Sequence, residues 1–162
     1  MGNGFAIQPT ENTVYTPIAG EISSIFPTQH ALGIMTPTGL EVLLHMGVDT
    51  VDLKGEPFTM KVKAGQKVKA GDVIAIMDLA AVKAAGKGTD IIVALTNGEV
   101  VDQLTLTELG KAVTPNQTIG HSLWPSPLEF SLGFYHFSFI NLLKTVLVLA
   151  LLVFLVLQPI QS

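Results

Sequence analysis

The chain of 162 residues contains no cysteine and no arginine, so all nine of its basic side chains are lysines. The absence of cysteine argues against a disulfide framework, removes thiolate metal ligands and fits a reducing compartment. The formal charge is −4 and no run of five or more basic residues occurs, which disfavours nucleic acid as a partner. The N-terminal MGNGFAIQPT has neither a basic start nor an apolar centre, so it does not have the pattern of a signal peptide.

Short apolar runs bounded by glycine and proline fill residues 1–121. Their spacing of about 8 to 12 residues predicts an all-β sandwich or barrel of short antiparallel strands. One segment is expected to be helical, Leu79 to Ala85, where good helix formers precede a glycine. We expect strands over 4–7, 14–18, 21–26, 32–35, 40–45, 50–53, 58–62, 73–78, 90–95 and 100–104.

Two histidines, His30 and His45, lie on the two arms of a predicted β-hairpin. Between the arms, Pro37-Thr38-Gly39 is a turn signal, because proline presets φ and glycine accepts positive φ. A two-residue loop at Pro37-Thr38 would place His30 directly opposite His45, with Cβ atoms roughly 5 Å apart. A glycine bulge at Gly39 would shift this register by one residue.

Facing histidines admit three interpretations. They can be accommodated structurally in a half-buried sheet. They can bind a metal, although zinc usually takes three or four protein ligands and the chain has no H-x-H or HExxH spacing. They can also act as a nucleophile and its helper, one ring attacking an electrophile while the other donates a hydrogen bond to the transferred charge.

The sequence around this pair resembles the active-site region of one protein family. The shared residues are Thr28-x-His30-Ala31, Gly39-x-Glu41-x-Leu43-x-His45 and His45-x-Gly47-x-Asp49-Thr50-Val51, followed by further glycines and valines at fixed spacing. The resemblance is to glucose-type enzyme IIA domains of the bacterial phosphoenolpyruvate-dependent sugar phosphotransferase system, and it covers roughly residues 1 to 121. It implies a barrel-sandwich hybrid fold, also described as a duplicated hybrid motif.

The resemblance also implies roles for individual residues. His45 matches the histidine that accepts a phosphoryl group from the carrier protein HPr and passes it to a IIB domain of a sugar permease. His30 matches the second active-site histidine, and Thr28 the threonine that orients it. Gly47 matches the residue whose carbonyl holds Nδ1 of the nucleophile. Two further positions match the rim of the site, Asp49 and Val51. No cofactor is implied, and regulated metabolic enzymes or permeases are further candidate partners.

The chemistry of a histidine relay is consistent with these roles. The nucleophile has to be neutral, and an ordinary imidazole pKa near 6.5 leaves most rings neutral at cytoplasmic pH. Phosphoryl transfer demands mainly positioning and charge stabilisation. A guanidinium would hold the phosphate more tightly than an imidazole, so the lack of arginine suits a relay that releases its cargo.

The C-terminal part of the chain differs in composition. We expect a phosphocarrier domain at 1–121, a linker at 122–138 that begins near Trp124-Pro-Ser-Pro127, and an apolar helix at 139–157. The 19 residues of Phe139 to Leu157 are about enough to cross a bilayer. The resemblance implies a cytoplasmic domain, which would be anchored to the inner face of the membrane if this helix inserts. Family domains usually begin with further strands, so the N-terminus is expected to be shortened.

Two other functional classes compete with the phosphocarrier. A zinc-dependent peptidase of related fold would need a third metal ligand and an H-x-H pair, which the sequence lacks. A purely regulatory binding module would use the phosphorylation state to control partner proteins, and it is compatible with the same residues.

Overall fold

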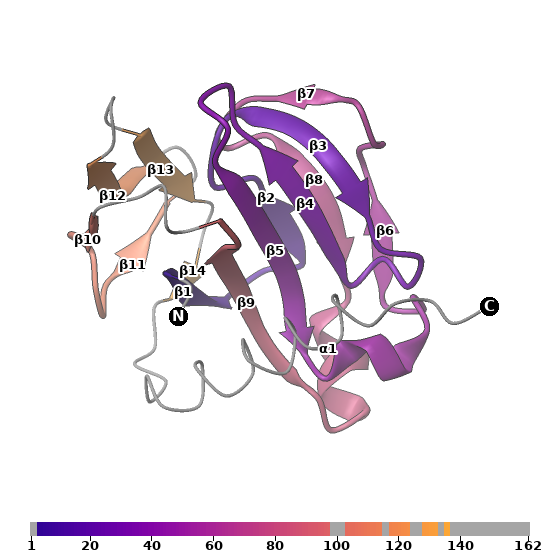
Figure 1. Cartoon of the computed structure of the whole chain (residues 1–162). Helices are drawn as coiled ribbons and strands as arrows, with labels where there is room; N and C mark the ends of the chain where they lie inside the picture. Colours follow the sequence, from indigo (N-terminus) through magenta and orange to yellow (C-terminus); the bar gives the residue numbers. More distant parts are fainter. Residues whose placement is uncertain (1–2, 98–102, 115–116, 124–127, 133–134, 137–162) are drawn as a thin grey trace.

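The computed structural model describes residues 3–97, 103–114, 117–123, 128–132 and 135–136. The described chain is mostly β-structure, and all of its strand pairings are antiparallel. Figure 1 shows one large sheet with smaller sheets beside it. The prediction of a mostly antiparallel β fold is therefore confirmed.

The large sheet has eight strands in the order β11-β14-β1-β9-β5-β4-β3-β7. Strands β4 and β5 form the predicted histidine hairpin, and β9 pairs with β5 on its other side. The strands are β1 (Gly4–Pro9), β3 (Gly20–Ile25), β4 (Ala31–Met35), β5 (Glu41–Val48), β7 (Lys67–Val68), β9 (Gly88–Leu95), β11 (Ala112–Val113) and β14 (Tyr135–His136).

Two three-stranded sheets complete the described fold. One has the order β2-β8-β6, from β2 (Thr13–Tyr15), β6 (Phe58–Met60) and β8 (Val73–Met77). The other has the order β10-β12-β13, from β10 (Gln103–Leu106), β12 (Gln117–Leu123) and β13 (Leu128–Leu132). In Figure 1 this second sheet lies to one side of the large sheet, beyond the end of β1.

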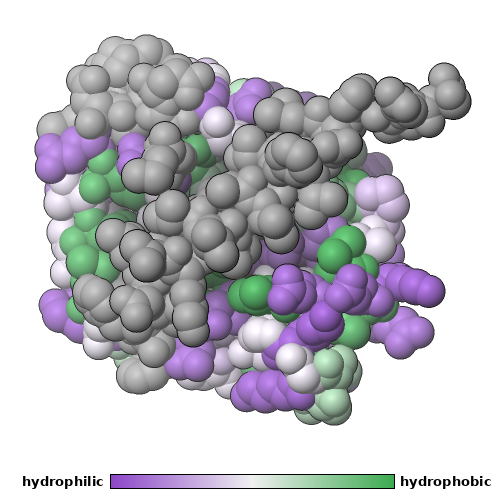
Figure 2. Space-filling model, turned by 60° about the horizontal axis from the view of Figure 1, so that its bottom comes forward, coloured by the Kyte–Doolittle hydropathy of each residue, from purple (hydrophilic) through white to green (hydrophobic). Residues whose placement is uncertain are grey.

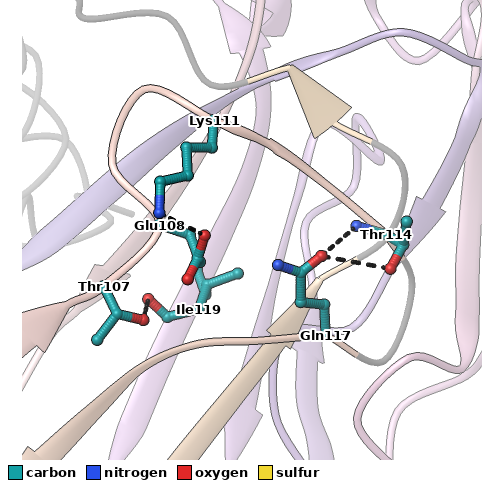
Figure 3. A network of polar contacts seen from close by, with 6 residues as sticks. All are labelled: Thr107, Glu108, Lys111, Thr114, Gln117 and Ile119. Carbon is teal, nitrogen blue, oxygen red and sulfur yellow. Dashed lines mark hydrogen bonds and ion pairs between the residues drawn. The ribbon is translucent and has the colours of Figure 1, made fainter.

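Polar contacts fasten the loops of the second small sheet (Figure 3). The backbone N–H and the hydroxyl of Thr107 both donate to the Ile119 carbonyl, at 2.8 and 3.2 Å. Lys111 pairs with Glu108 at 3.2 Å, across one turn of chain. The side-chain oxygen of Gln117 accepts from the Thr114 N–H at 3.1 Å. The Thr107 bonds join the end of β10 to β12, while the other two contacts close the turns on either side of β11.

The core lies where the large sheet faces the β2-β8-β6 sheet. Strand β1 alternates as a half-buried strand should, with Phe5 and Ile7 buried, whereas β9 is buried along almost its whole length. Fully buried side chains from β3, β4, β5, β8 and β9 meet here: Ile22, Leu32, Ile34, Leu44, Met46, Ile74, Met77 and Ile91. The hairpin strands that carry the histidines therefore have one face anchored in this core.

The surface of the described chain is mixed in character. Where Figure 2 shows coloured atoms, hydrophilic and hydrophobic side chains lie next to one another. The large apolar side chains that remain exposed are Val51, Val73 and Leu109. Single exposed apolar residues of this kind are ordinary on a folded domain.

Two short helical segments interrupt the strands. The predicted helix is present as α1 (Leu79–Ala84), where the Asp78 carboxylate accepts from the N–H groups of Ala80 and Ala81. The strand predicted over 50–53 is wrong, because this segment is a 3₁₀ helix, η1 (Thr50–Leu53). Left-handed backbone at Asp49 and Lys54, with φ of 58° and 52°, turns the chain at both ends of η1 and prevents an extended strand.

Only part of the prediction for the C-terminal segment can be compared with the described residues. Strands β13 and β14 lie within 122–138, which the sequence predicts to be a linker, and β14 pairs with β1 and β11. The apolar helix predicted at 139–157 lies outside the described residues, so it stays a prediction. Within the described part of the chain, no helix is long and apolar enough to cross a membrane.

Candidate functional site

The β4–β5 hairpin has a register one residue away from the prediction. Ala31, not His30, stands opposite His45, and the loop has three residues rather than two. Thr36 and Leu40 close the loop through the Thr36 N–H, which donates to the Leu40 carbonyl at 3.0 Å. Gly39 adopts φ of 85°, so the glycine bulge that the sequence allowed is present. The predicted direct pairing of the two histidines is therefore wrong.

The two imidazole rings nevertheless meet. Their centroids are 4.8 Å apart and the ring planes are inclined by 77°. His30 precedes β4, and Gln29 before it has a left-handed backbone with φ of 53°, so strict strand alternation does not govern the direction of the His30 ring. The Met46 N–H donates to the His30 carbonyl at 2.7 Å, which ties the start of β4 to the end of β5. Both histidines are only 5% exposed.

A backbone carbonyl fixes the tautomer of His45. Its Nδ1 lies 2.7 Å from the Gly47 carbonyl oxygen, which can only accept, so Nδ1 carries a proton and donates it. In the neutral ring Nε2 then has a free lone pair. Gly47 has φ of 85° and lies at an irregularity in the β5–β9 pairing, between Met46 and Val48. This break in the ladder makes the Gly47 carbonyl available to the ring.

The His30 ring has a different type of partner. Its Nδ1 forms a hydrogen bond with the Thr28 hydroxyl, which can either donate or accept. The ring also packs edge-on against Phe26, with centroids 5.5 Å apart. When the Thr28 hydroxyl donates, Nε2 of His30 carries the proton and becomes a hydrogen-bond donor. Thr28 thus contacts the ring that the sequence resemblance assigned to it, while leaving the tautomer of that ring open to exchange.

Burial lowers the pKa of both rings. The pKa of His30 falls to about 4, because desolvation and, secondarily, the neighbouring His45 disfavour its charged form. Desolvation also lowers the pKa of His45, while its bond to the Gly47 carbonyl and the charge of Asp49 oppose that shift. Both imidazoles are therefore neutral at neutral pH, which is the protonation state that a histidine nucleophile requires.

The expected rim residues lie on the segment that follows β5. Asp49 is close enough to affect the His45 pKa, and Val51 is 45% exposed on η1. The same loop folds against Thr28, since a Cβ built on Gly55 would lie 3.4 Å from the Thr28 carbonyl oxygen. The structure thus brings the six sequence-predicted site residues into one region of the hairpin and its flanking loop.

An ion pair fastens the far end of this region. The Lys87 ammonium lies 2.5 Å from the Asp52 carboxylate, and this contact ties η1 to the residue that precedes β9. The Asp52 side chain is largely exposed, so the contribution of the pair to stability is small.

The donor set of this region is poor for a metal. No group of three or more His, Cys, Asp or Glu side chains in the described ranges is arranged to hold a metal ion. Two imidazoles alone fall short of the three or four protein ligands that zinc sites use. This part of the chain therefore offers no support for the zinc-dependent peptidase interpretation.

Two residues beside the histidines were not predicted as site residues. Phe26 reaches His30 only because the chain turns back between β3 and β4, where the Phe26 N–H donates to the Ala31 carbonyl. Thr50 is completely buried and its hydroxyl donates to the Met46 carbonyl at 2.6 Å. The only sequence signal for Thr50 was its place in the family pattern, because its partner is a backbone atom that no side-chain pattern reveals.

Comparison with known proteins decides the family. Residues 1–101 match the family described as phosphoenolpyruvate-dependent sugar phosphotransferase system, EIIA 1. The chain belongs to this family. The resemblance inferred from the hairpin residues is therefore confirmed.

Individual relatives are consistent with this EIIA assignment. The glucose-specific EIICBA component of Streptococcus pneumoniae is 50% identical over 110 residues, which are 68% of this chain and 15% of that protein. The glucose-specific EIIA component of Halalkalibacterium halodurans is 49% identical over 67% of this chain and 61% of its own length. The matched region thus spans less than two thirds of either curated relative.

A solved structure shares the fold. Glucose permease IIA from Mycoplasma capricolum superposes with a TM-score of 0.56 at 31% sequence identity, covering 80% of this chain and 77% of that one. The antiparallel β fold of this EIIA-family chain is therefore the fold of that IIA protein.

Proposed function

We propose that this chain is a phosphocarrier of the sugar phosphotransferase system, with His45 accepting a phosphoryl group from phospho-HPr and passing it to a IIB domain. The observation that carries the proposal is the pair of buried, neutral imidazoles 4.8 Å apart. One of them has a free Nε2 because its Nδ1 donates to the Gly47 carbonyl. Membership of the phosphotransferase system EIIA family indicates that the group transferred at this pair is a phosphoryl group.

In the proposed transfer, the Nε2 lone pair of His45 attacks phosphorus. A new N–P bond forms while the N–P bond to the donor imidazole breaks, and the donor ring leaves with the bonding electron pair. His45 keeps its Nδ1 proton throughout, so its ring gains positive charge as the N–P bond forms. The Gly47 carbonyl stabilises that charge, because its negative end faces the Nδ1 proton. The onward reaction, transfer to IIB, breaks the same N–P bond.

His30 acts on the phosphoryl oxygens rather than on phosphorus. Nε2 of His30 donates to a phosphoryl oxygen when the Thr28 hydroxyl donates to Nδ1. A neutral imidazole donor stabilises the transferring group without holding it as strongly as a guanidinium would. The absence of arginine from the whole chain is consistent with a carrier that releases its phosphoryl group.

The proposal also covers the architecture of the domain and the role of the C-terminal segment. The strands would form a barrel-sandwich hybrid over 1–121, in which the hairpin presents the site to both partners. The apolar segment 139–157 would hold the carrier at the inner face of the membrane. Such a tether would raise the effective concentration of the carrier beside a permease. Regulation of metabolic enzymes or permeases stays a prediction.

The test is phosphorylation of the full chain. Incubation with labelled phosphoenolpyruvate, enzyme I and HPr should give an acid-labile, base-stable phosphoprotein. His45→Ala should abolish labelling. His30→Gln should still be labelled but should transfer the group to a IIB domain roughly 100-fold more slowly, since it loses an aligned donor at the transferring group.

A third histidine provides the control. His121 is exposed on β12, which belongs to a different sheet from the hairpin, so His121→Gln should be labelled and should transfer like the wild type. Undiminished labelling of His45→Ala, or labelling that is lost in His121→Gln, would overturn the assignment of the phosphoacceptor.

A further inference from the structure

The buried threonine at the start of η1 contacts the backbone that holds both histidines. The Thr50 hydroxyl donates to the Met46 carbonyl at 2.6 Å, and Met46 uses its N–H to donate to the His30 carbonyl at 2.7 Å. Met46, which follows His45 in the chain, is therefore bonded through its N–H to the residue that bears the other imidazole. Through its carbonyl it is bonded to Thr50.

The methyl group of Thr50 lies against Gly47, the residue that follows Met46. A Cβ built on Gly47 would collide with Thr50 Cγ2, so this methyl occupies the space directly beside the Gly47 backbone. The two branches of one side chain thus contact the peptide between Met46 and Gly47 and the backbone that follows it. That peptide immediately precedes the carbonyl that accepts from His45 Nδ1.

From these contacts we infer that Thr50 is a positioning residue for the proposed phosphoryl transfer, acting through the Met46–Gly47 peptide to aim the Gly47 carbonyl at His45. Its hydroxyl fixes the orientation of the peptide, and the Gly47 carbonyl in turn fixes the tautomer that leaves Nε2 of His45 unprotonated. Left-handed backbone at Gly47 and Asp49 interrupts the regular ladder here, so the side chain of Thr50 supplies a restraint that the strand does not.

The inference rests on the proposed function for its consequence in transfer, but the tautomer can be measured without any transfer. In Thr50→Val the shape is kept and the hydroxyl is lost. The Gly47 carbonyl should then be less well aligned, and ¹⁵N shifts of the His45 ring at about pH 8 should show a mixture of tautomers. Phosphoryl acceptance from HPr should fall roughly 10-fold, the scale expected for loss of orientation at a reacting atom.

Thr50→Ser and Thr16→Val separate positioning from folding. Serine restores the hydroxyl, so Thr50→Ser should regain the Nδ1–H tautomer and acceptance within about twofold of the wild type. Thr16 is equally buried and its hydroxyl also donates to a backbone carbonyl, that of Ile18 at 2.7 Å, but it bonds to neither histidine segment. Thr16→Val should lose stability while leaving the His45 tautomer unchanged.

The possible outcomes separate failure of the inference about Thr50 from failure of the proposed function. A His45 tautomer in Thr50→Val that matches the wild type would overturn the inference, as would equal effects of Thr50→Val and Thr16→Val on the ring shifts. If the wild-type chain shows the Nδ1–H tautomer, Thr50→Val loses it, and neither is phosphorylated, the inference about Thr50 stands and the proposed function fails.

Discussion

At the residue scale, the two histidines differ in the atom that each Nδ1 meets. The Gly47 carbonyl can only accept, so it commits His45 to one tautomer. The Thr28 hydroxyl can donate or accept, so it orients His30 without committing its proton. The same type of side chain can therefore serve as nucleophile in one position and as a hydrogen-bond partner of the phosphoryl group in the other.

Removal of the Thr28 hydroxyl should affect mainly the second of these roles. In Thr28→Val, His30 loses the partner of its Nδ1, and its Nε2 is less often the protonated nitrogen. We expect transfer from phosphorylated His45 to IIB to slow roughly 10-fold, the equivalent of one net hydrogen bond. Rapid-quench measurement of the two half-reactions checks this, and acceptance from HPr should change less than transfer to IIB.

The conservative variant provides the control for Thr28. Thr28→Ser keeps the hydroxyl and should transfer at close to the wild-type rate. A slow Thr28→Ser, or equal slowing of both half-reactions in Thr28→Val, would indicate a packing role in place of ring orientation.

At the element scale, the hairpin is shaped by two glycines with the same backbone angle and different surroundings. Gly39 and Gly47 both have φ of 85°. A Cβ at Gly39 would meet nothing within 4 Å, whereas one at Gly47 would lie 2.7 Å from the Gly88 carbonyl oxygen and collide with Thr50. Gly39 sets the hairpin register, while Gly47 permits close contact among β5, β9 and η1.

Substitution by alanine should therefore be more damaging at Gly47 than at Gly39. Gly39→Ala should cost about 1 to 2 kcal/mol in the free energy of unfolding, from left-handed backbone strain alone, and should leave labelling intact. Gly47→Ala adds a steric clash to the same strain and should cost on the order of 3 kcal/mol or more, with lower phosphorylation. Urea denaturation and labelling of each variant would measure both effects. Equal losses in the two variants would contradict the role given to the enclosed Gly47 site.

At the scale of the whole molecule, burial of the histidine pair links the site to acid stability. Folding encloses both rings, and it holds the pKa of His30 at about 4 while the unfolded chain keeps the ordinary value of about 6.5. When the pH is below about 6.5, the unfolded chain binds more protons than the folded chain. The contribution of His30 to stability is therefore intact above about pH 6.5 and is lost progressively as the pH falls toward 4.

A histidine replacement should expose this linkage. Between about pH 7 and pH 4.5, His30→Gln should lose less stability than the wild type, by on the order of 2 kcal/mol. Urea denaturation at both pH values gives the comparison. His121→Gln is the matched control, because it makes the same substitution at an exposed histidine. A His30→Gln variant with the wild-type acid loss would contradict the buried, neutral state of the ring.

Much of the fold followed from local sequence patterns. Apolar runs between glycines and prolines predicted most strands of the described fold, and LAAVKAA predicted α1, because strand and helix propensities are local properties. The segment 50–53 was mispredicted because two left-handed residues, Asp49 and Lys54, determine its conformation. Strands β13 and β14 paired into sheets despite the linker-like composition around them, since pairing depends on partners distant in the chain.

Residue types at fixed spacing were enough to predict the site residues and to identify the family, because such a pattern can be read directly along the chain. How the two imidazoles meet could be seen only in the folded chain. The hairpin register differs by one residue from the simplest expectation, and the turn at Gln29 together with the core packing of β5 brings the rings to 4.8 Å. The partners of their Nδ1 atoms are a backbone carbonyl for His45 and a hydroxyl for His30. Each contact joins residues only two positions apart, but the backbone path that permits it depends on the pairing of β5 with β4 and β9, and that pairing involves residues distant in the sequence.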